Sequence, residues 1–437
     1  MLTRFAPSPT GYLHIGNART ALICYIVAKK AGGQFMLRID DTDLERSKAE
    51  YETAIKEDLE WLGLKWDKFA RQSERLERYA AVKRQLIDAG RLYPCFETQE
   101  ELEIRRKMQL SRGLPPVYDR AALKLDAAQI EAQIAAGKKP HYRFKMEHAD
   151  IIWDDEIRGI TKFHGAHLSD PIVIRETGAY TYMLPSAVDD IDFAVTHVVR
   201  GEDHVSNTAV QIQMFEALGA PVPKFAHLAL IKGKQGKISK REGGFDIRSL
   251  RADGIEPMAI SSFLARVGTS EPIDARPDLQ TLIAEFDVKK FSRAPATYDP
   301  QEIERLNAKL VHEMPYAQVA ARVKVDEDFW NAVKANLTNV SEAADWWRIC
   351  KEPLKSNGEN LEFTKQAASL LPGGNWDSST WNQWIEAVKT ATGRKGKELF
   401  MPLRLALTGM EHGPELRDML PLIGREKALK RLNGEEA

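Results

Sequence analysis

Three residues near the N-terminus, His14, Gly16 and Asn17, stand where a proline-containing turn leads into a predicted helix. The first turn of a helix presents free backbone N–H groups and the positive end of the helix dipole, which together suit a phosphate group. His14 could donate a hydrogen bond to charge developing on that phosphate, and Gly16, which lacks a β-carbon, would let an adenine ring approach the backbone. The competing interpretation is a histidine that caps an ordinary core helix. For these residues alone, that interpretation is favoured.

A second group of residues that could handle phosphate lies more than two hundred positions downstream. Lys237 and Lys240 place two ammonium groups a few residues apart, and Ser239 and Arg241 add a hydroxyl and a third cation. Such donors can stabilise a pyrophosphate leaving group. The competing interpretation is a solvated basic turn, which the segment alone again favours.

The elements around the first group predict a parallel β-α-β unit. Residues 2–6 read as a strand that ends at prolines, and residues 35–39 read as a second strand. Between them, apolar residues recur at helical spacing from residue 16 until a pair of glycines. This pattern predicts a doubly wound α/β sheet. Residues 48–61 and 74–89 predict amphipathic helices.

Further along the chain the pattern changes twice. Residues 96–184 contain a charged helix at 99–112 and then several β-type runs, so we interpret the range as an insertion. The α/β pattern returns with a buried strand at 193–200, a helix, and a strand at 225–231. After residue 245 the chain is predicted to be mostly helical.

Composition places the chain among ordinary globular proteins. Its 437 residues suffice for two or three folding units, and 43% are hydrophobic and 29% charged. No apolar run reaches the ~18 residues of a membrane helix, and the N-terminus does not read as a secretory signal. Cys24, Cys95 and Cys350 are odd in number and scattered, which argues against a disulfide framework. We therefore expect a cytoplasmic protein with no membrane contact.

Charge alone does not indicate a nucleic-acid partner. The net charge is −1, although a local basic patch would be enough for phosphate contacts. Basic residues slightly outnumber acidic ones near the C-terminus: Arg394, Lys395, Lys397, Arg404, Arg417, Arg425, Lys427, Lys430 and Arg431. An ordinary solvated helical surface explains this excess equally well, and charge alone favours that explanation.

The order of five motifs overturns these local interpretations. The motifs are Arg4 to Gly11, His14 to Asn17, Arg38 to Asp43, Val199 to Asp203 and Lys237 to Arg241. In this order they resemble a bacterial-type glutamyl-tRNA synthetase, a class I aminoacyl-tRNA synthetase. The resemblance covers nearly the whole chain, and residues 393–404 are similar to the helical anticodon-binding region of that family.

The resemblance implies a fold: a Rossmann-like α/β catalytic domain with an inserted α+β domain, followed by an all-α anticodon-binding region. The implied ranges are 1–95 and 185–244 for the two halves of the catalytic domain, 96–184 for the acceptor-end-binding insertion, 245–320 for a helical stem-contact domain and 321–437 for the helical anticodon-binding domain. The loop from Lys237 to Arg241 falls in the second catalytic half.

The resemblance also implies an activity. It is the ATP-dependent ligation of L-glutamate to the 3′ end of tRNA(Glu) through a glutamyl-adenylate, with release of AMP and pyrophosphate. ATP would act with Mg²⁺, and the family typically needs bound tRNA for the activation step. A monomer is expected, and whether tRNA(Gln) is also charged stays open.

The resemblance assigns site residues by position. His14, Lys237 and Lys240 would be catalytic, and the ATP-binding set would be His14, Gly16, Asn17, Lys237, Ser239 and Lys240. The glutamate-binding set would be Arg4, Ser8, Asp40, Tyr182 and Arg200. Asp40 stands where the family often has glutamate, while Ser186 and His204 occupy variable positions. No zinc is expected, because Cys95 has no second cysteine nearby and tetrahedral zinc needs about four ligands.

Other functions remain as alternatives. A truncated paralogue that glutamylates a tRNA base would resemble only the catalytic half, and a glutaminyl enzyme fits the motifs less well. A nucleotidyltransferase shares the histidine-x-glycine signature but would not need the long helical C-terminal region. A non-catalytic RNA-binding protein would not need Arg4, His14 and Arg200 together with the two lysines.

Overall fold

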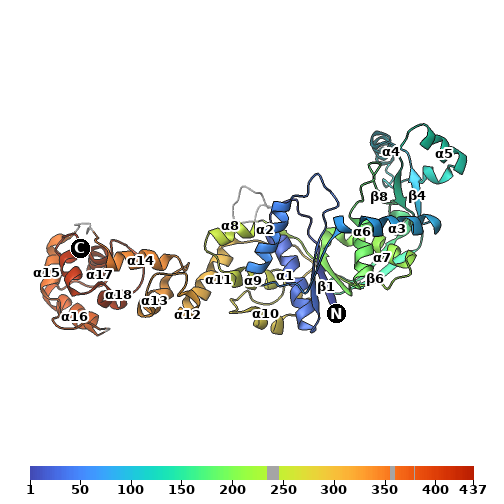
Figure 1. Cartoon of the computed structure of the whole chain (residues 1–437). Coiled ribbons are helices and arrows are strands. Elements are labelled where there is room, and N and C mark those ends of the chain that lie inside the picture. Colours follow the sequence, from blue (N-terminus) through green and yellow to red (C-terminus); the bar gives the residue numbers. More distant parts are fainter. Residues whose placement is uncertain (234–245, 355–359, 378) are drawn as a thin grey trace. The chain divides into compact units, whose positions relative to one another are not determined.

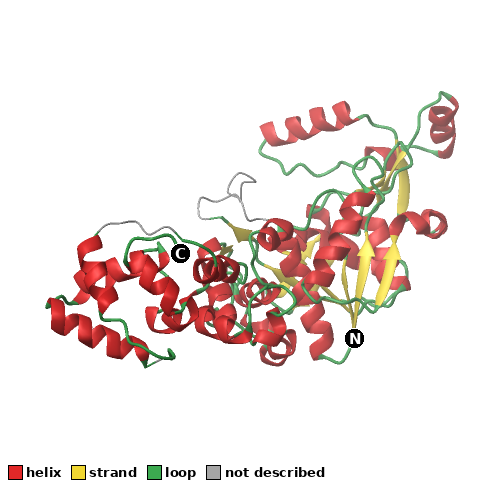
Figure 2. Ribbon diagram, turned by 60° about the vertical axis from the view of Figure 1, so that its left-hand side comes forward, coloured by secondary structure: helices red, strands yellow, loops and turns green. Residues whose placement is uncertain are grey.

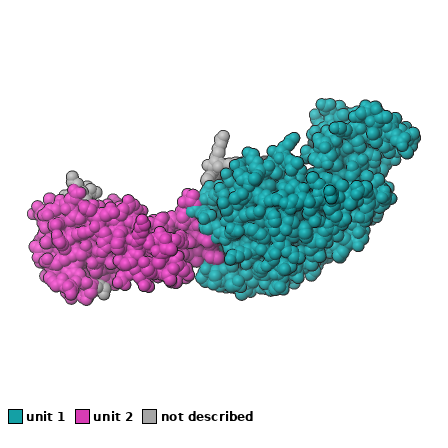
Figure 3. All heavy atoms as spheres, in the orientation of Figure 1, with its two compact units in different colours: residues 1–251, 260–299 teal, residues 252–259, 300–437 magenta. Residues whose placement is uncertain are grey.

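The computed structural model describes residues 1–233, 246–354, 360–377 and 379–437 (Figure 1). The chain divides into two compact units, coloured separately in Figure 3. The first contains residues 1–251 and 260–299, and the second contains residues 252–259 and 300–437. The finer domain boundaries implied by the sequence stay predictions.

A mostly parallel sheet, seven-stranded when counted over the described residues, organises the first unit (Figure 2). In spatial order its strands are β3 (Lys68–Arg71), β2 (Gln34–Ile39), β1 (Leu2–Phe5), β9 (His197–Gly201), β10 (Lys224–Leu228), β6 (Asp150–Asp155) and β7 (Gly159–His164). Neighbouring strands are parallel except for β6 and β7, which form an antiparallel hairpin. The doubly wound pattern expected from the sequence is therefore present.

The predicted β-α-β unit is confirmed. Helix α1 (Ile15–Lys30) connects β1 to β2, and the two strands pair in parallel. The two predicted amphipathic helices are α2 (Ala49–Trp61) and α3 (Leu76–Asp88). A short 3-10 helix, η1 (Gln72–Arg75), precedes α3.

Strand β1 lies at the point where the strand order reverses. The chain adds β2 and β3 on one side of β1, and β9 and β10 on the other. In open α/β sheets, ligands bind beyond the carboxyl ends of the strands at such a point. Arg4 on β1 and Arg200 on β9 stand near those ends. The topology alone thus marks this edge as the candidate site.

Two strand boundaries differ from the sequence prediction. The predicted strand at 193–200 begins only at His197, because helix α6 (Met183–Asp192) ends in a turn where Ala194 adopts a left-handed φ of 55°. The predicted strand at 225–231 is divided into β10 and the separate β11 (Ile231–Lys232), which pairs with β12 (Ala296–Thr297). Helix α7 (Val205–Ala217) follows β9 as expected.

Residues 92–174 contain both a small sheet and part of the large one. Strands β4 (Leu92–Cys95), β5 (His141–Phe144) and β8 (Ile172–Ile174) form an antiparallel sheet, three-stranded within the described residues. Helices α4 (Gln99–Ser111) and α5 (Ala127–Ala135) lie in the same stretch of sequence. The β6–β7 hairpin also falls there, yet it joins the large sheet where Asp155 pairs with Phe225 of β10. Alternating hydrophobicity cannot show which sheet a strand joins, so the sequence did not reveal this.

The chain after residue 246 is mainly helical, as predicted. Its helices are α8 (Ile247–Ala252), α9 (Pro257–Arg266), α10 (Leu279–Glu285), α11 (Pro300–Glu313), α12 (Tyr316–Val319), α13 (Glu327–Val333), α14 (Glu342–Lys351), α15 (Leu361–Ser369), α16 (Thr380–Thr392), α17 (Gly396–Thr408), α18 (Leu416–Ile423) and α19 (Arg425–Leu432). None of the helices in the described part of the chain combines the length and apolar character that a membrane span requires.

Two tryptophans lie at the centre of the second unit's core. Trp330 and Trp384 are fully buried among aliphatic side chains from α13 to α19. Their indole N–H groups donate to the backbone carbonyls of Met314 at 3.0 Å and Ala367 at 2.8 Å. Buried indoles need such partners, and the pairing fixes the orientation of the helices within this unit.

Candidate active site

A cavity of about 440 Å³ lies at the carboxyl ends of β1 and β9 in the first unit. Each predicted site residue that the structure describes lines it: Arg4, Ser8, His14, Gly16, Asn17, Asp40, Tyr182 and Arg200. The remaining predicted residues, Lys237, Ser239 and Lys240, lie outside the described residues. Side chains almost two hundred positions apart in the sequence thus line one cavity.

His14 caps helix α1 through Nδ1, which leaves Nε2 free to bind a ligand. Its Nδ1 accepts hydrogen bonds from the backbone N–H groups of Gly16 at 3.1 Å and Asn17 at 3.3 Å. Desolvation lowers the pKa of His14 below its ordinary value, so the ring is neutral at pH 7. A neutral imidazole that accepts at Nδ1 carries its proton on Nε2. The capping role therefore sets the tautomer that can donate to a phosphate, and the two interpretations of this residue are compatible.

Gly16 leaves room for the ring of His14. A β-carbon at this position would lie 3.1 Å from Cε1 and 3.2 Å from Nδ1 of the capping histidine. Because these contacts are closer than ordinary van der Waals contacts, a side chain at this position would require the ring to shift by a few tenths of an ångström. This reason for a glycine is separate from the predicted approach of an adenine ring.

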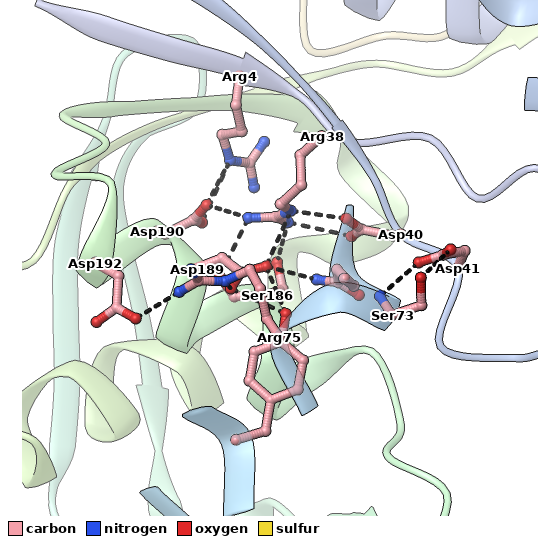
Figure 4. Close-up of polar contacts among 12 residues, drawn as sticks. Arg4, Arg38, Asp40, Asp41, Ser73, Arg75, Ser186, Asp189, Asp190 and Asp192 are labelled. Carbon is pink, nitrogen blue, oxygen red and sulfur yellow. Dashed lines mark hydrogen bonds and ion pairs between the residues drawn. The ribbon is translucent and has the colours of Figure 1, made fainter. Parts of the chain in front are cut away.

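A network of buried charges adjoins the cavity, and we call it the Arg38 cluster: Arg4, Arg38, Asp40, Ser186, Asp189 and Asp190 (Figure 4). Arg38 is the centre of this cluster. Its Nε donates to Asp40 Oδ1 at 2.7 Å, and its Nη1 donates to Asp190 Oδ1 at 2.7 Å. Its Nη2 donates to Ser186 Oγ at 2.9 Å, and Asp189 lies 3.7 Å from Nε. Each charge in the cluster thus has an opposite charge beside it.

Asp40 lies on the cavity wall, and both of its carboxylate oxygens already accept hydrogen bonds from Arg38. One carboxylate oxygen accepts from Arg38 Nε and the other from Nη2, the latter at 3.1 Å. Burial raises the pKa of Asp40 to about 6 against the opposing charge of Arg38. A carboxylate has about four lone-pair sites, so Asp40 can still accept from a ligand.

Arg4 is tied to the cluster at one nitrogen only. Its Nε donates to Asp190 Oδ1 at 3.1 Å. Burial alone would raise the pKa of Asp190, but the charges of Arg4 and Arg38 outweigh it and lower that pKa. The terminal nitrogens of Arg4 make no hydrogen bond to any described residue, and Arg4 lines the cavity. They are therefore available to a ligand.

Asp189 anchors the cluster to helix α3 and the turn before it. It accepts from Arg75 Nε at 2.7 Å (Figure 4). It also accepts from Tyr79 Oη at 2.9 Å and from Gln72 Nε2 at 3.2 Å. Sequence reasoning missed Asp189 and Asp190. The signal available to it was a pair of adjacent acidic residues at 189 and 190 directly after the apolar pair Ala187 and Val188 of helix α6.

A second buried group, the Arg200 cluster, consists of Arg200, Thr208, His227 and Asp155. Arg200 Nη2 donates to Thr208 Oγ1 at 2.6 Å, and Nε donates to His227 Nε2 at 3.3 Å. Across the described residues, no carboxylate forms an ion pair with Arg200. Burial, helped by the nearby charge of Arg4, lowers the pKa of Arg200 to about 10. A pKa of about 10 still leaves the guanidinium charged at neutral pH.

Tyr182 adds a hydroxyl beside the Arg200 cluster. Its Oη lies 3.4 Å from His204 Nδ1, and the two rings meet edge to face. Burial raises the pKa of Tyr182 to about 12, so the hydroxyl stays protonated. His204 and Ser186, which the sequence marked as variable positions, both line the cavity. Ser8 lines it as well.

Arg19 is a cavity residue that sequence reasoning missed. Its Nη1 donates to the carbonyl of Ala229 at 2.8 Å, and its Nη2 donates to that of Val267 at 2.9 Å. Burial lowers the pKa of Arg19 to about 10. Arg19 lies near the N-terminal end of α1, and in the sequence it resembles an ordinary surface arginine of a helix.

One group of side chains in the three-stranded sheet could hold a metal ion. The ligand atoms of Cys95, Glu97 and His141 lie within 4.8 Å of one another. The hydroxyl of Tyr118 donates to Glu97 Oε1 at 2.7 Å and lies 3.8 Å from Cys95 Sγ. Burial raises the pKa of the Cys95 thiol to about 12. The sequence-based prediction that no zinc binds here rested on the absence of a second cysteine near Cys95. The fold brings donors of other types, Glu97 and His141, close to this thiol.

The cavity is suited to a small molecule with a carboxylate and an ammonium, placed next to a phosphate. The terminal nitrogens of Arg4 and Nη1 of Arg200 can donate to a carboxylate, and such charge-assisted hydrogen bonds are strong. Asp40 offers the negative charge for an ammonium. His14 and the N-terminus of α1 offer donors for a phosphate.

Two family models match the sequence, one over its N-terminal part and one over its C-terminal part. Residues 1–305 match the family described as tRNA synthetases class I (E and Q), catalytic domain. Residues 281–434 match the family described as Anticodon binding domain. The first match alone covers well over half of the chain.

Individual proteins are similar to the chain over its whole length. Glutamate–tRNA ligase 1 of Rickettsia rickettsii (strain Sheila Smith) is 52% identical, with 99% of both chains covered. Glutamate–tRNA ligase 2 of Methylobacterium sp. (strain 4-46) is also 52% identical, over 100% of this chain and 99% of the relative. The crystal structure of a glutamate tRNA ligase from Elizabethkingia meningosepticum CCUG26117, in complex with its amino acid, matches with a TM-score of 0.85 at 27% identity. That match covers 99% of this chain and 98% of the other.

Proposed function

Because the chain belongs to the glutamate–tRNA ligases of the class I aminoacyl-tRNA synthetases, we propose a role for each cavity residue in this reaction. The enzyme ligates glutamate to tRNA at the expense of ATP. The observation that carries our proposal is the gathering of Arg4, Asp40 and Arg200 around one cavity beside the capped terminus of α1.

The side-chain carboxylate of glutamate binds Arg200, with the terminal nitrogens of Arg4 and the hydroxyl of Tyr182 beside it. Arg4 and Arg200 line the same cavity, and the charge of Arg4 lowers the pKa of Arg200, so a carboxylate bound there would relieve the repulsion between the two guanidinium groups. The α-ammonium binds Asp40. The α-carboxylate is the nucleophile, and it must stay free of a guanidinium fork in order to reach the phosphate. The cavity therefore offers the guanidinium groups of Arg4 and Arg200 to the side-chain carboxylate and the carboxylate of Asp40 to the ammonium, which suits glutamate.

Activation follows from position and charge rather than from a general base. The α-carboxylate, ionised at neutral pH, attacks the α-phosphate of ATP, giving glutamyl-adenylate and pyrophosphate. His14 donates from Nε2 to the phosphate, and the N-terminus of α1 adds backbone donors. Lys237 and Lys240 are predicted from the sequence to neutralise the leaving pyrophosphate. Mg²⁺ bound to ATP would neutralise part of the same charge.

Transfer completes the reaction. The terminal adenosine hydroxyl of the tRNA attacks the carbonyl carbon of the adenylate, an ester bond forms, and AMP leaves. The helical region that matches the anticodon-binding family supplies the second contact with the tRNA. We further propose that the enzyme acts as a cytoplasmic monomer.

We propose that this chemistry requires no zinc. The group around Cys95 contains one thiol, and Glu97 already accepts from Tyr118 and pairs with Arg105 at 3.5 Å. Arg143 adds positive charge, with its guanidinium 4.0 Å from the ring centre of Tyr118. Elemental analysis of the purified protein is expected to find far less than one zinc per chain. A stoichiometric amount would show that this set of donors binds zinc.

Aminoacylation of purified tRNA(Glu) and tRNA(Gln), assayed side by side, tests the function. The enzyme is expected to attach glutamate to tRNA(Glu), and the second tRNA shows whether it discriminates. ATP–pyrophosphate exchange that ignored both glutamate and tRNA would contradict the proposal, because a small-molecule nucleotidyltransferase would behave in that way.

A further inference from the structure

We propose that His227, held by Asp155, is a positioning residue that aims Arg200 into the cavity while leaving its charge uncancelled, so that the site selects an anionic side chain. The inference rests on the proposed function, in which Arg200 binds the side-chain carboxylate of glutamate. It concerns two residues, on β10 and β6, that do not line the cavity.

Strand register brings the three residues together. In the parallel pairing of β9 with β10, His227 stands opposite Arg200. Strand β6 joins the other edge of β10 at the pairing of Asp155 with Phe225. Asp155 Oδ1 accepts from the backbone N–H groups of Arg158 at 2.9 Å and His227 at 3.2 Å. The carboxylate is therefore fixed by the backbone before it contacts the imidazole.

The hydrogen bond to Asp155 sets the protonation of His227. Asp155 Oδ2 is in contact with His227 Nδ1, so that nitrogen carries the proton. Burial alone would raise the pKa of Asp155, but the hydrogen bond from His227 and others from the backbone outweigh it and lower that pKa. Burial lowers the pKa of His227 despite the carboxylate, and the ring is neutral. The second nitrogen, Nε2, is then an acceptor.

That acceptor and one hydroxyl hold two corners of the Arg200 guanidinium. Arg200 Nε donates to His227 Nε2 at 3.3 Å, and Arg200 Nη2 donates to Thr208 Oγ1 at 2.6 Å. The Thr208 hydroxyl lies 2.8 Å from His227 Nε2 and donates to the backbone carbonyl of His204 at 3.2 Å, so its lone pairs are left to accept from Arg200. Of the Arg200 nitrogens, Nη1 makes no hydrogen bond with any of the described residues. It is the corner left for a ligand.

The neutrality of the two acceptors matters for selectivity. In the Arg38 cluster two of the acceptors, Asp40 and Asp190, are carboxylates, which cancel the arginine charge while they satisfy its donors. His227 and Thr208 satisfy the donors of Arg200 without cancelling its charge. A buried guanidinium without a counter-ion is costly, and a bound carboxylate removes that cost. A neutral amide in the same place would leave the charge unpaired, so the site favours glutamate over glutamine.

His227→Leu and Thr208→Val test the inference, with Thr364→Val as the matched control for the threonine variant. Thr364 is also a buried threonine whose hydroxyl donates to a backbone carbonyl, but it lies on α15 in the second unit and does not line the cavity. The assay is ATP–pyrophosphate exchange by the full chain in the presence of tRNA, with KM measured for glutamate and for ATP and inhibition measured for glutamine. Thr208→Val keeps the Asp155–His227 contact, so it remains informative if His227→Leu does not fold.

Each test variant is expected to raise the KM for glutamate about tenfold or more, the usual effect of losing a hydrogen bond to a charged group. The KM for ATP should stay unchanged, and the preference for glutamate over glutamine should fall by a similar factor. The control should change none of these values. A merely structural role for His227 would lower kcat and the amount of folded enzyme instead.

Combination with Arg200→Leu separates this inference from the proposed function. In that background, His227→Leu should cause no further loss of glutamate affinity, because there is no guanidinium left to position. The inference fails if Arg200→Leu weakens glutamate binding while folded His227→Leu and Thr208→Val enzymes bind normally. If Arg200→Leu itself leaves the KM for glutamate unchanged, the role proposed for Arg200 fails first.

Discussion

The Arg38 cluster and the Arg200 cluster are both buried at the same edge of the large sheet, yet they treat positive charge differently. Arg38 is surrounded by the carboxylates of Asp40, Asp189 and Asp190. Arg200 instead contacts a hydroxyl and a neutral imidazole. The compensated arginine holds the structure together, whereas the uncompensated one is prepared for a charge that the ligand brings. Compensation therefore distinguishes Arg38 from Arg200, although both are arginines near strand ends. Arg4 is intermediate, because its Nε is paired with Asp190 while its terminal nitrogens are open to the cavity.

Replacing each arginine with leucine should give opposite results for stability. Arg38→Leu leaves Asp40 without its partner and weakens the pairing of Asp190, so the free energy of unfolding should fall by about 3–5 kcal/mol. Arg200→Leu removes a buried charge that has no counter-ion, so stability should stay the same or rise. Urea-induced unfolding followed by circular dichroism compares the two midpoints. An equal decrease in the free energy of unfolding in both variants would contradict the distinction between the two clusters.

His14 sharpens the comparison, because one ring supplies both a structural acceptor and a free donor. His14→Asn keeps a good N-cap, whereas His14→Ala loses about 1 kcal/mol of helix stability. Both variants lose the Nε2 donor, and adenylate formation should fall about 100-fold in each. Exchange kinetics and thermal unfolding, measured together, separate the two roles. A normal rate of ATP–pyrophosphate exchange in His14→Asn would show that His14 contributes only as the N-cap of α1 and not as a donor to phosphate.

Asp40 belongs to the compensated cluster but also lines the cavity, and pH tests its second role. Burial raises the pKa of Asp40 to about 6. Below that pH the carboxyl becomes neutral and loses its attraction for the α-ammonium, so the KM for glutamate should rise by up to about tenfold per pH unit. Above pH 7 the KM should be flat. In Asp40→Asn the KM for glutamate should be high and independent of pH in this range. If the KM of that variant still rose below pH 6, another group would be responsible for the titration.

Much of the large sheet and of the cavity lining could be predicted from the sequence, for a physical reason. Arg4 lies near the end of β1, and His14 ends the segment between β1 and α1, whose prolines and glycine are visible in the sequence. Because the carboxyl ends of parallel strands meet at one edge, a residue at the end of β9 such as Arg200 must lie nearby. The local patterns alone favoured other interpretations, and it was the order of the motifs, through the resemblance to a family, that pointed to these residues, whereas Arg19 was missed.

The residues behind the cavity wall could not be predicted in the same way. Asp190 is paired with Arg4 across 186 positions, and His227 is paired with Asp155 across 72. Such pairs depend on strand order and register, which alternating hydrophobicity does not specify. The β6–β7 hairpin shows the same limit, since its sequence does not reveal that it joins the large sheet beside β10.

The central claim is that the uncancelled charge of Arg200 binds the side chain of glutamate. The most direct test is the KM for glutamate of Arg200→Leu, measured by tRNA-dependent ATP–pyrophosphate exchange beside the KM for ATP. Loss of a buried charge partner costs about 2–5 kcal/mol, so the KM for glutamate should rise at least about 30-fold while that for ATP stays the same. A folded Arg200→Leu enzyme with an unchanged KM for glutamate would contradict the claim.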